Sequence, residues 1–195
     1  MEETTGRRGG RRPGSGRPRT RPHPGLIGPG VPHLRREYFE ARLPVSVKVR
    51  MQPGVGRLSA QRRILEIESA LREAKDRSNL RIVHYAISDK ELRLIVEADG
   101  AVALARGMQG VSVRIARRLN RLDERHGSVF VDRFAAKALL TVDDAAEAAR
   151  ELFAHARAES GSLSSFRYLG ADPSDDSPVG SPRTRVLQTA LSRLT

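Results

Sequence analysis

The sequence predicts an α+β fold in which an antiparallel sheet carries helices on one face. Three observations lead to this prediction. Between about residues 44 and 139, apolar and polar residues alternate in runs that are typical of half-buried strands. Between these runs, apolar residues recur every three or four positions, as they do on one side of an amphipathic helix. Two of the strand-like runs are separated only by Asp89 and Lys90, a connection that allows antiparallel pairing alone.

The elements are expected in the order βαββαβα. Val45, Val47 and Val49 alternate with polar residues in the first strand, and Ile64 and Ile67 have helical spacing in the first helix. The predicted elements are strands at 44–51, 80–88, 91–98 and 128–139, and helices at 57–77, about 104–122 and 143–159. Four strands in this order, with helices between them, predict a four-stranded antiparallel sheet of the ferredoxin-like kind.

The composition divides the chain of 195 residues into one domain and two tails. Residues 1–42 are rich in Gly, Pro and Arg and poor in apolar residues, so a disordered basic arm is expected there. The domain is expected at 43–159, where the periodic runs lie. Residues 160–195 are rich in Ser and Pro, which predicts a flexible C-terminal tail in which only 186–194 could form a short helix.

The chain is strongly basic, with 35 Lys and Arg against 23 Asp and Glu and a formal net charge of +12 at pH 7. Such a charge favours polyanions, among them DNA, RNA and an acidic membrane surface. The absence of cysteine excludes disulfides and thiolate metal sites. No apolar run approaches the roughly 20 residues that span a bilayer. We therefore expect a cytoplasmic, nucleoid-associated protein with no membrane contact.

Two groups of arginines are candidates for DNA contact. Arg17 and Arg19 lie in the arm, where an extended Gly-Arg-Pro segment is slim enough to enter a narrow minor groove, although a solvated tail is the alternative. The second predicted helix carries a basic stripe with no acid between its members, which favours an anionic ligand. A solvated face paired with Asp123 and Glu124 is the alternative for this stripe. The stripe consists of Arg114, Arg117, Arg118 and Arg121.

Three segments of the chain resemble a known family. They are HYAISDKELRLIVEA, LARGMQGVSVRIARRLNR and GSVFVDRFAAKAL, and the arm RRGGRRPGSGRPR precedes them. In this order they resemble the REP-associated tyrosine transposases of the HUH endonuclease superfamily. The resemblance covers nearly the whole chain except the end of the tail, and its most specific residues are Gly107, Met108, Gln109 and Asn120. It implies the ancestry of a bacterial DNA transposase, which cuts single strands with the help of a metal and often works as a homodimer.

The resemblance also implies which positions would perform the chemistry. The third strand of the family carries two histidines, one residue apart, that hold a divalent metal, and Glu91 and Arg93 take these positions here. A guanidinium has no lone pair for a metal and stays charged. The family's nucleophilic tyrosine lies on the last helix, where Glu151 stands, with His155 one turn later. We therefore predict no metal site and no catalytic residue, and we expect Arg93 to hold a phosphate where the metal would be.

The resulting hypothesis is a DNA-binding, transposase-like protein that recognises hairpin or single-stranded DNA, is catalytically inactive and needs no cofactor. Two alternatives stay open. One is an active transposase or endonuclease with relocated catalytic residues, which would use Mg²⁺ or Mn²⁺. The other is an RNA-binding module, which has less support because aromatic residues for base stacking make up only 4% of the chain. His84, beside the replaced ligands, is expected to be a packed residue.

Overall fold

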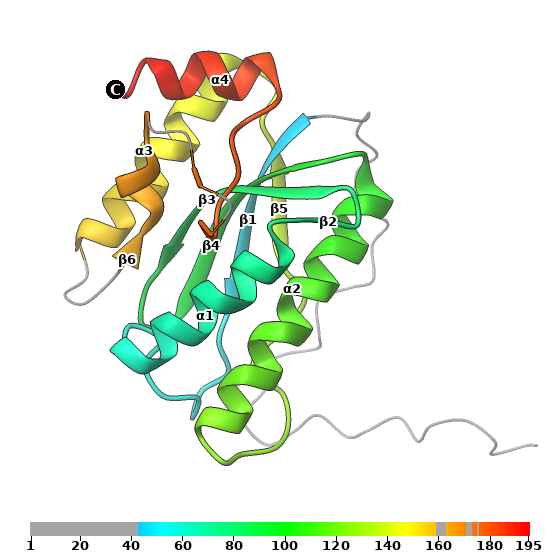
Figure 1. The fold of residues 1–195 in the computed structure, drawn as a ribbon, viewed down its shortest axis with the longest axis vertical. Coiled ribbons are helices and arrows are strands. Elements are labelled where there is room, and N and C mark those ends of the chain that lie inside the picture. Colours follow the sequence, from blue (N-terminus) through cyan, green and yellow to red (C-terminus); the bar gives the residue numbers. More distant parts are fainter. Residues whose placement is uncertain (1–42, 159–162, 171–172, 175) are drawn as a thin grey trace, which may run out of the picture. The chain divides into compact units, whose positions relative to one another are not determined.

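The computed structural model describes residues 43–158, 163–170, 173–174 and 176–195 (Figure 1). The predicted arm at 1–42 lies outside the described residues, and so do Arg17 and Arg19. The elements are β1 (Leu43–Arg50), α1 (Gln61–Ala74), β2 (Asp76–Arg77), β3 (Leu80–Ile87), β4 (Glu91–Ala98), α2 (Ala101–Leu122), β5 (Ala135–Ala138), α3 (Val142–Ala158), β6 (Leu163–Ser164), a 3-10 helix (Ser165–Tyr168) and α4 (Arg185–Ser192).

One antiparallel sheet runs through the domain in the order β2-β3-β4-β1-β5, and β6 pairs with β3. This arrangement confirms the predicted α+β fold. The four predicted strands are β1, β3, β4 and β5, while the two-residue strands β2 and β6 extend the sheet beside β3. The connection from β1 through α1 to β2 passes over β4 and β3, and the connection from β4 through α2 to β5 passes over β1, which puts β1 and β4 inside the sheet. Glu91 and Arg93 therefore lie on a central strand.

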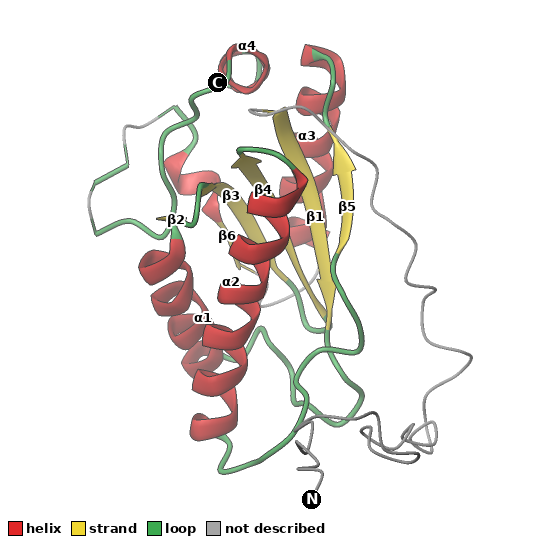
Figure 2. Cartoon of the chain, turned by 90° about the vertical axis from the view of Figure 1, so that its right-hand side faces the viewer, coloured by secondary structure: helices red, strands yellow, loops and turns green. Residues whose placement is uncertain are grey.

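Helices cover both faces of the sheet, which corrects the prediction that they pack on one face (Figure 2). α1 and α2 pack on one face, in a core that includes Val45, Val47 and Leu94. α3 and α4 pack on the other face, in a cluster that includes Val83 and Ile95. The physical reason is that β3 and β4 are buried along almost their whole length, so both of their faces need cover. None of the described helices is long and apolar enough to span a bilayer.

Two predicted elements are shorter in the structure than in the prediction. The first helix ends at Ala74 because the chain then turns into β2, which pairs with β3. Ser78 and Asn79 make the turn between β2 and β3, each with a φ of 57°. Such left-handed turns form between strands and leave no room for another helical turn. Of the strand predicted at 128–139, only β5 pairs in continuous register with β1.

The C-terminal segment, in its described parts between 163 and 195, packs on the domain and is not the flexible tail that was predicted. Gly180 donates its backbone N–H to the carbonyl oxygen of Ile82 at 2.8 Å. Glu97 of β4 accepts hydrogen bonds from the backbone N–H groups of Arg183 and Thr184, just before α4. The expected short helix forms as α4 and packs on α3. The buried apolar residues that hold the segment are Val179 and, on one side of α4, Leu187, Ala190 and Leu191.

Candidate nucleic-acid interface

The inner side of α2 determines how this helix sits on the sheet. Leu104, Val111 and Ile115 are buried in the core between α2 and the strands. At Gly107 the helix passes so close to β3 that an added Cβ would lie 2.5 Å from the Cβ of Leu80. Such a distance is far below a normal van der Waals contact, so only glycine allows this approach. With its inner side held in this way, α2 presents its opposite side to solvent.

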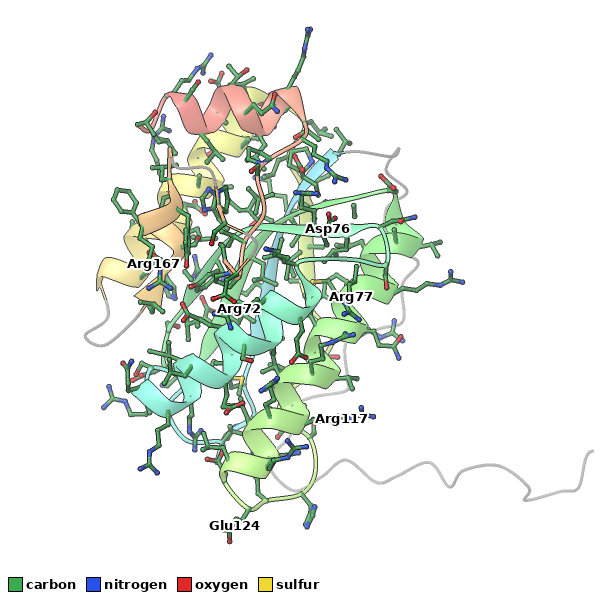
Figure 3. All side chains as sticks on the ribbon, in the orientation of Figure 1. Arg72, Asp76, Arg77, Arg117, Glu124 and Arg167 are labelled. Atoms are coloured by element: carbon green, nitrogen blue, oxygen red, sulfur yellow. The ribbon has the colours of Figure 1, made fainter. Side chains whose placement is uncertain are left out.

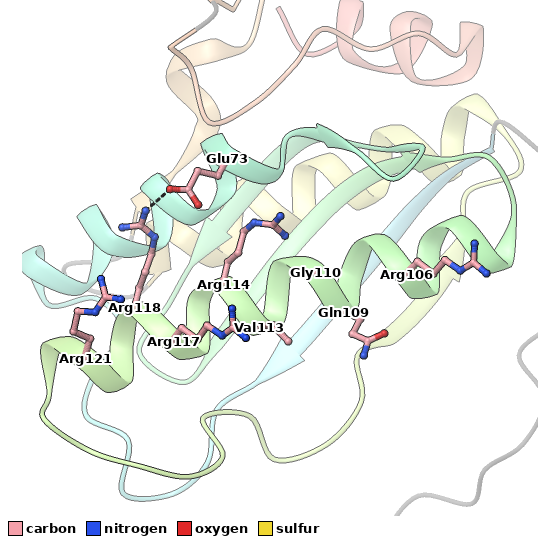
Figure 4. A pocket seen from close by; sticks show the side chains of 9 residues that line it. All are labelled: Glu73, Arg106, Gln109, Gly110, Val113, Arg114, Arg117, Arg118 and Arg121. Carbon is pink, nitrogen blue, oxygen red and sulfur yellow. Dashed lines mark hydrogen bonds and ion pairs between the residues drawn. The ribbon is translucent and has the colours of Figure 1, made fainter.

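The outward side of α2 carries four arginines that form no ion pair within the described part of the chain, and we call them the α2 arginine face. They are Arg106, Arg114, Arg117 and Arg121. Together with Gln109, Gly110, Val113 and the ion-paired Glu73 and Arg118, they line an open groove of about 630 Å³ (Figure 4). Arg117 extends from the helix away from the domain (Figure 3). The sequence reasoning missed Arg106, although it lies only about two helical turns before Arg114.

Arg118 differs from the other arginines of α2 because two carboxylates of α1 hold it. It forms an ion pair with Glu66 at 2.8 Å and a second one with Glu73. The hydrogen bond to Glu66, followed by that to Glu73, raises the pKa of Arg118. Asp123, a partner expected for the stripe, instead pairs with Arg63 of α1 at 2.8 Å. The acids beside α2 thus come from another helix, which no pattern along α2 itself can reveal.

On the opposite face of the sheet, the positions that align with the family's metal ligands form one cluster, which we call the Glu91 cluster. The Nε atom of Arg93 donates a hydrogen bond to Oε1 of Glu91. His155 of α3 has its Nε2 atom 3.1 Å from the same oxygen, and Lys48 of β1 has its Nζ atom 3.9 Å from Oε2. Glu151 is exposed on α3, and no hydrogen bond or ion pair joins it to these residues. Of the three positions that align with the family's chemistry, the structure therefore brings Glu91 and Arg93 together. His155 and Lys48 complete this cluster.

The Glu91 cluster does not fit a divalent metal. Glu91 is its one carboxylate, and both oxygens of that carboxylate already face basic side chains. Arg93 and Lys48 are cations that repel a metal ion at this distance, and neither a guanidinium nor an ammonium has a lone pair to donate. Across the described residues, no group of three His, Cys, Asp or Glu side chains is arranged to hold a metal ion. The cluster instead forms a network in which Lys48, Arg93 and His155 surround the Glu91 carboxylate.

His84 is a packed residue, as predicted, and takes no part in the Glu91 cluster. Its Nδ1 atom lies 2.9 Å from the hydroxyl of Ser165. Its ring meets the ring of Phe153 edge-on, with the centroids 5.2 Å apart. Burial lowers the pKa of His84 to about 4. The neutral imidazole therefore links β3 to α3 and to the C-terminal segment.

Comparison with solved structures identifies the type of fold. A REP-associated tyrosine transposase, solved bound to a REP hairpin, matches with a TM-score of 0.57 at 13% sequence identity, over 79% of this chain and 94% of that chain. The fold is transposase-like. A putative transposase from Deinococcus radiodurans R1 matches with a TM-score of 0.41 at 12% identity, over 66% of this chain and 96% of that chain. No family model matches the sequence, and no curated protein does.

The transposase-like fold places the two charged regions of this protein on opposite faces of its sheet. The α2 arginine face lies on the side of α1 and α2, and the Glu91 cluster lies on the side of α3 (Figure 2). The predicted DNA-contacting residues Arg93 and Arg118 are therefore separated by the sheet, and each is already paired with carboxylates. Only Arg114, Arg117 and Arg121 of the predicted residues remain on one unpaired surface in the described structure.

Proposed function

We propose that this protein binds hairpin or single-stranded DNA through the α2 arginine face and does not cleave it. The observation that carries the proposal is a row of four arginines on one helix with no carboxylate partner in the described structure. Like charges on neighbouring helical turns repel one another, and DNA phosphates relieve that repulsion while releasing condensed counterions. The net charge of +12 adds long-range attraction to polyanions. A solved transposase of similar fold was bound to a REP hairpin, which favours a hairpin ligand here.

The other predicted arginines are given smaller or separate parts in this proposal. Arg93 and Arg118 are paired with carboxylates, so a phosphate would have to displace a partner before it could bind either of them. Arg17 and Arg19 lie outside the described residues, and we propose that they add phosphate contacts from the N-terminal arm. Deleting residues 1–21 tests this part, because a contributing arm would flatten the salt dependence of binding.

The absence of cleavage is proposed from the chemistry of the three replaced positions. Metal-assisted transfer needs side chains that donate lone pairs to the metal, and Arg93 cannot do so. A glutamate at Glu151 cannot replace a tyrosine in a stable covalent link to DNA, and Glu151 is exposed on α3. An active enzyme with relocated residues would need another ligand set, and the described residues offer none.

The RNA-binding alternative has less support. RNA-binding sheets stack bases on exposed aromatic side chains. Among the strands that the structure describes, Tyr85 is the sole Phe, Tyr or Trp, and it is fully buried. Its hydroxyl donates a hydrogen bond to Glu68 inside the core. No stacking surface is therefore available on this sheet.

The first prediction concerns the salt dependence of binding to a fluorescein-labelled imperfect hairpin DNA with a single-stranded tail. Replacing Arg114, Arg117 and Arg121 together by Ala should weaken binding and lower the slope of log affinity against log salt by about 2 to 3, since each lost phosphate contact removes roughly 0.7 to 0.9. Fluorescence anisotropy between low and physiological salt measures both effects. An unchanged slope would contradict the assignment of the α2 arginine face.

A matched control removes the same charge elsewhere. Arg62 of α1, Arg150 of α3 and Arg185 of α4 are exposed, and replacing all three by Ala lowers the net charge equally. This variant should keep most of the slope if local contacts matter, and should match the first variant if only net charge matters. The same DNA incubated with Mg²⁺ or Mn²⁺ should show no nick on a denaturing gel and no covalent adduct. A metal-dependent nick would establish the active alternative.

A further inference from the structure

Gly110 is a glycine in the middle of α2 that the described fold does not require. An interior glycine destabilises a helix relative to alanine. At Gly107 that cost has a structural reason, the close approach to Leu80. At Gly110 an added Cβ would meet only the tip of the Arg114 side chain, at 2.9 Å, and that flexible tip can move away. The bare backbone at Gly110 faces outward, into the open groove of the α2 arginine face.

Gln109 and Val113 beside Gly110 are neutral, the flexible tip of Arg114 lies close to Gly110, and the two ends of the groove are cationic. Gln109 is exposed, and Val113 is an apolar side chain that is 41% exposed. Figure 4 shows Arg106 at one end of the row and Arg117 and Arg121 toward the other, with Gln109, Gly110, Val113 and Arg114 between them. At 1.5 Å per residue, Arg106 and Arg121 lie about 22 Å apart along the axis. Gln109 and Val113 thus form a small neutral patch among the arginines.

We propose that α2 enters the major groove of B-form duplex DNA, with Gln109 and Val113 against base edges and the flanking arginines on phosphates. This proposal rests on the proposed function and narrows it to the duplex stem of the DNA. Arginine is suited to phosphates, glutamine can bond an adenine edge in two places, and an apolar side chain contacts the thymine methyl group. Gly110 leaves the helix backbone free to approach the bases.

The shape of the groove selects the kind of duplex. The major groove of B-form DNA is about 12 Å wide and accepts an α-helix. The major groove of A-form RNA is deep and narrow, so a helix flanked by packed neighbours cannot reach its bases. α2 has such a neighbour, because α1 packs along it and is tied to it through Arg118. We therefore expect a DNA stem, and not an RNA stem, to be the ligand.

The test selects stems from a library of DNA hairpins with a randomised stem, using the full chain and its variants. The wild type should enrich stems that carry A·T pairs. Gln109→Ala should reduce the ratio of binding between A·T and other pairs at one position by about 5- to 150-fold, which is the range for one two-point contact with a base. Replacing the adenine of that pair by 7-deazaadenine, which lacks the major-groove N7 acceptor, should weaken wild-type binding and leave Gln109→Ala unaffected. Gln61→Ala, an exposed glutamine of α1, is the matched control and should keep the wild-type preference.

A second variant tests the approach to the backbone. Gly110→Leu adds a side chain that points into the groove, so it should keep the thermal stability of the domain and bind every stem at least about 10-fold more weakly. Ala154→Leu, which adds a similar apolar side chain at an exposed position of α3, is its control and should bind as the wild type does. Salt-dependent binding that is equal for DNA and RNA stems and indifferent to Gly110→Leu would overturn groove insertion while leaving the proposed function intact. If the wild type shows no salt-dependent binding to DNA at all, the proposed function itself is overturned.

Discussion

At the scale of single residues, His84 couples the protonation of a buried ring to the stability of the fold. Its pKa is lowered by burial to about 4, from 6.5 in a solvated chain. The unfolded chain therefore takes up a proton near pH 6.5, whereas the folded chain does so only near pH 4. Between these values, acid favours the unfolded state. This difference between the two pKa values corresponds to about 3 kcal/mol of folding stability, which is present above pH 6.5 and fully lost below the lower pKa.

We predict that the free energy of unfolding falls by up to about 3 kcal/mol on account of His84 as the pH drops from 7 to 4. His84→Gln keeps a polar side chain beside Ser165 but cannot titrate, so its stability should change less over this interval, even though it starts lower at pH 7. Urea unfolding at several pH values measures both curves. All other histidines and acids are common to the two proteins. Parallel curves of stability against pH would therefore mean that His84 does not cause the pH dependence.

At the scale of elements, α2 contains two glycines one turn apart that have different surroundings. Gly107 faces β3, and Gly110 faces solvent. The sequence places both on one helix but cannot distinguish them, since the difference lies in Leu80, which is remote in sequence. The strands and helices themselves were predictable because their apolar periodicity is local. The short first helix and the cover on the second sheet face were not, because both depend on contacts with β3.

We predict opposite effects of alanine at these two glycines. Gly107→Ala forces a methyl group against Leu80 and should destabilise the domain by about 1 to 3 kcal/mol, as overpacked cores do. Gly110→Ala meets only a movable side-chain tip and should stabilise α2 by up to about 1 kcal/mol. Thermal unfolding of the two variants provides the comparison. Equal shifts of the same sign would contradict the packing described for α2.

At the scale of the whole molecule, the distribution of charge departs most from what the sequence predicts. The arginine stripe was visible as a pattern on one helix, but its pairing was not, because Glu66 and Glu73 reach Arg118 from α1. Likewise, the Glu91 cluster could be predicted at Glu91 and Arg93 from the resemblance, whereas Lys48 joins from a different strand. The low apolar content of the C-terminal segment predicts a flexible tail, because the few residues that anchor it do not stand out in its composition.

If the α2 arginine face binds DNA as proposed, the double ion pair of Arg118 makes the carboxylates of α1 internal competitors of DNA for a fifth cation on α2. Replacing Glu66 and Glu73 by Gln should release this cation, tighten binding and steepen the salt slope by about 1. Stability should change little, because each exposed ion pair contributes at most about 1 kcal/mol. Glu147→Gln with Glu151→Gln, on exposed positions of α3, changes the net charge equally and should not have this effect. If the α3 variant tightens binding as much as the α1 variant does, α1 exerts no such competition. If only the α1 variant tightens binding, Glu66 and Glu73 keep the DNA affinity of the wild type lower than α2 alone would give.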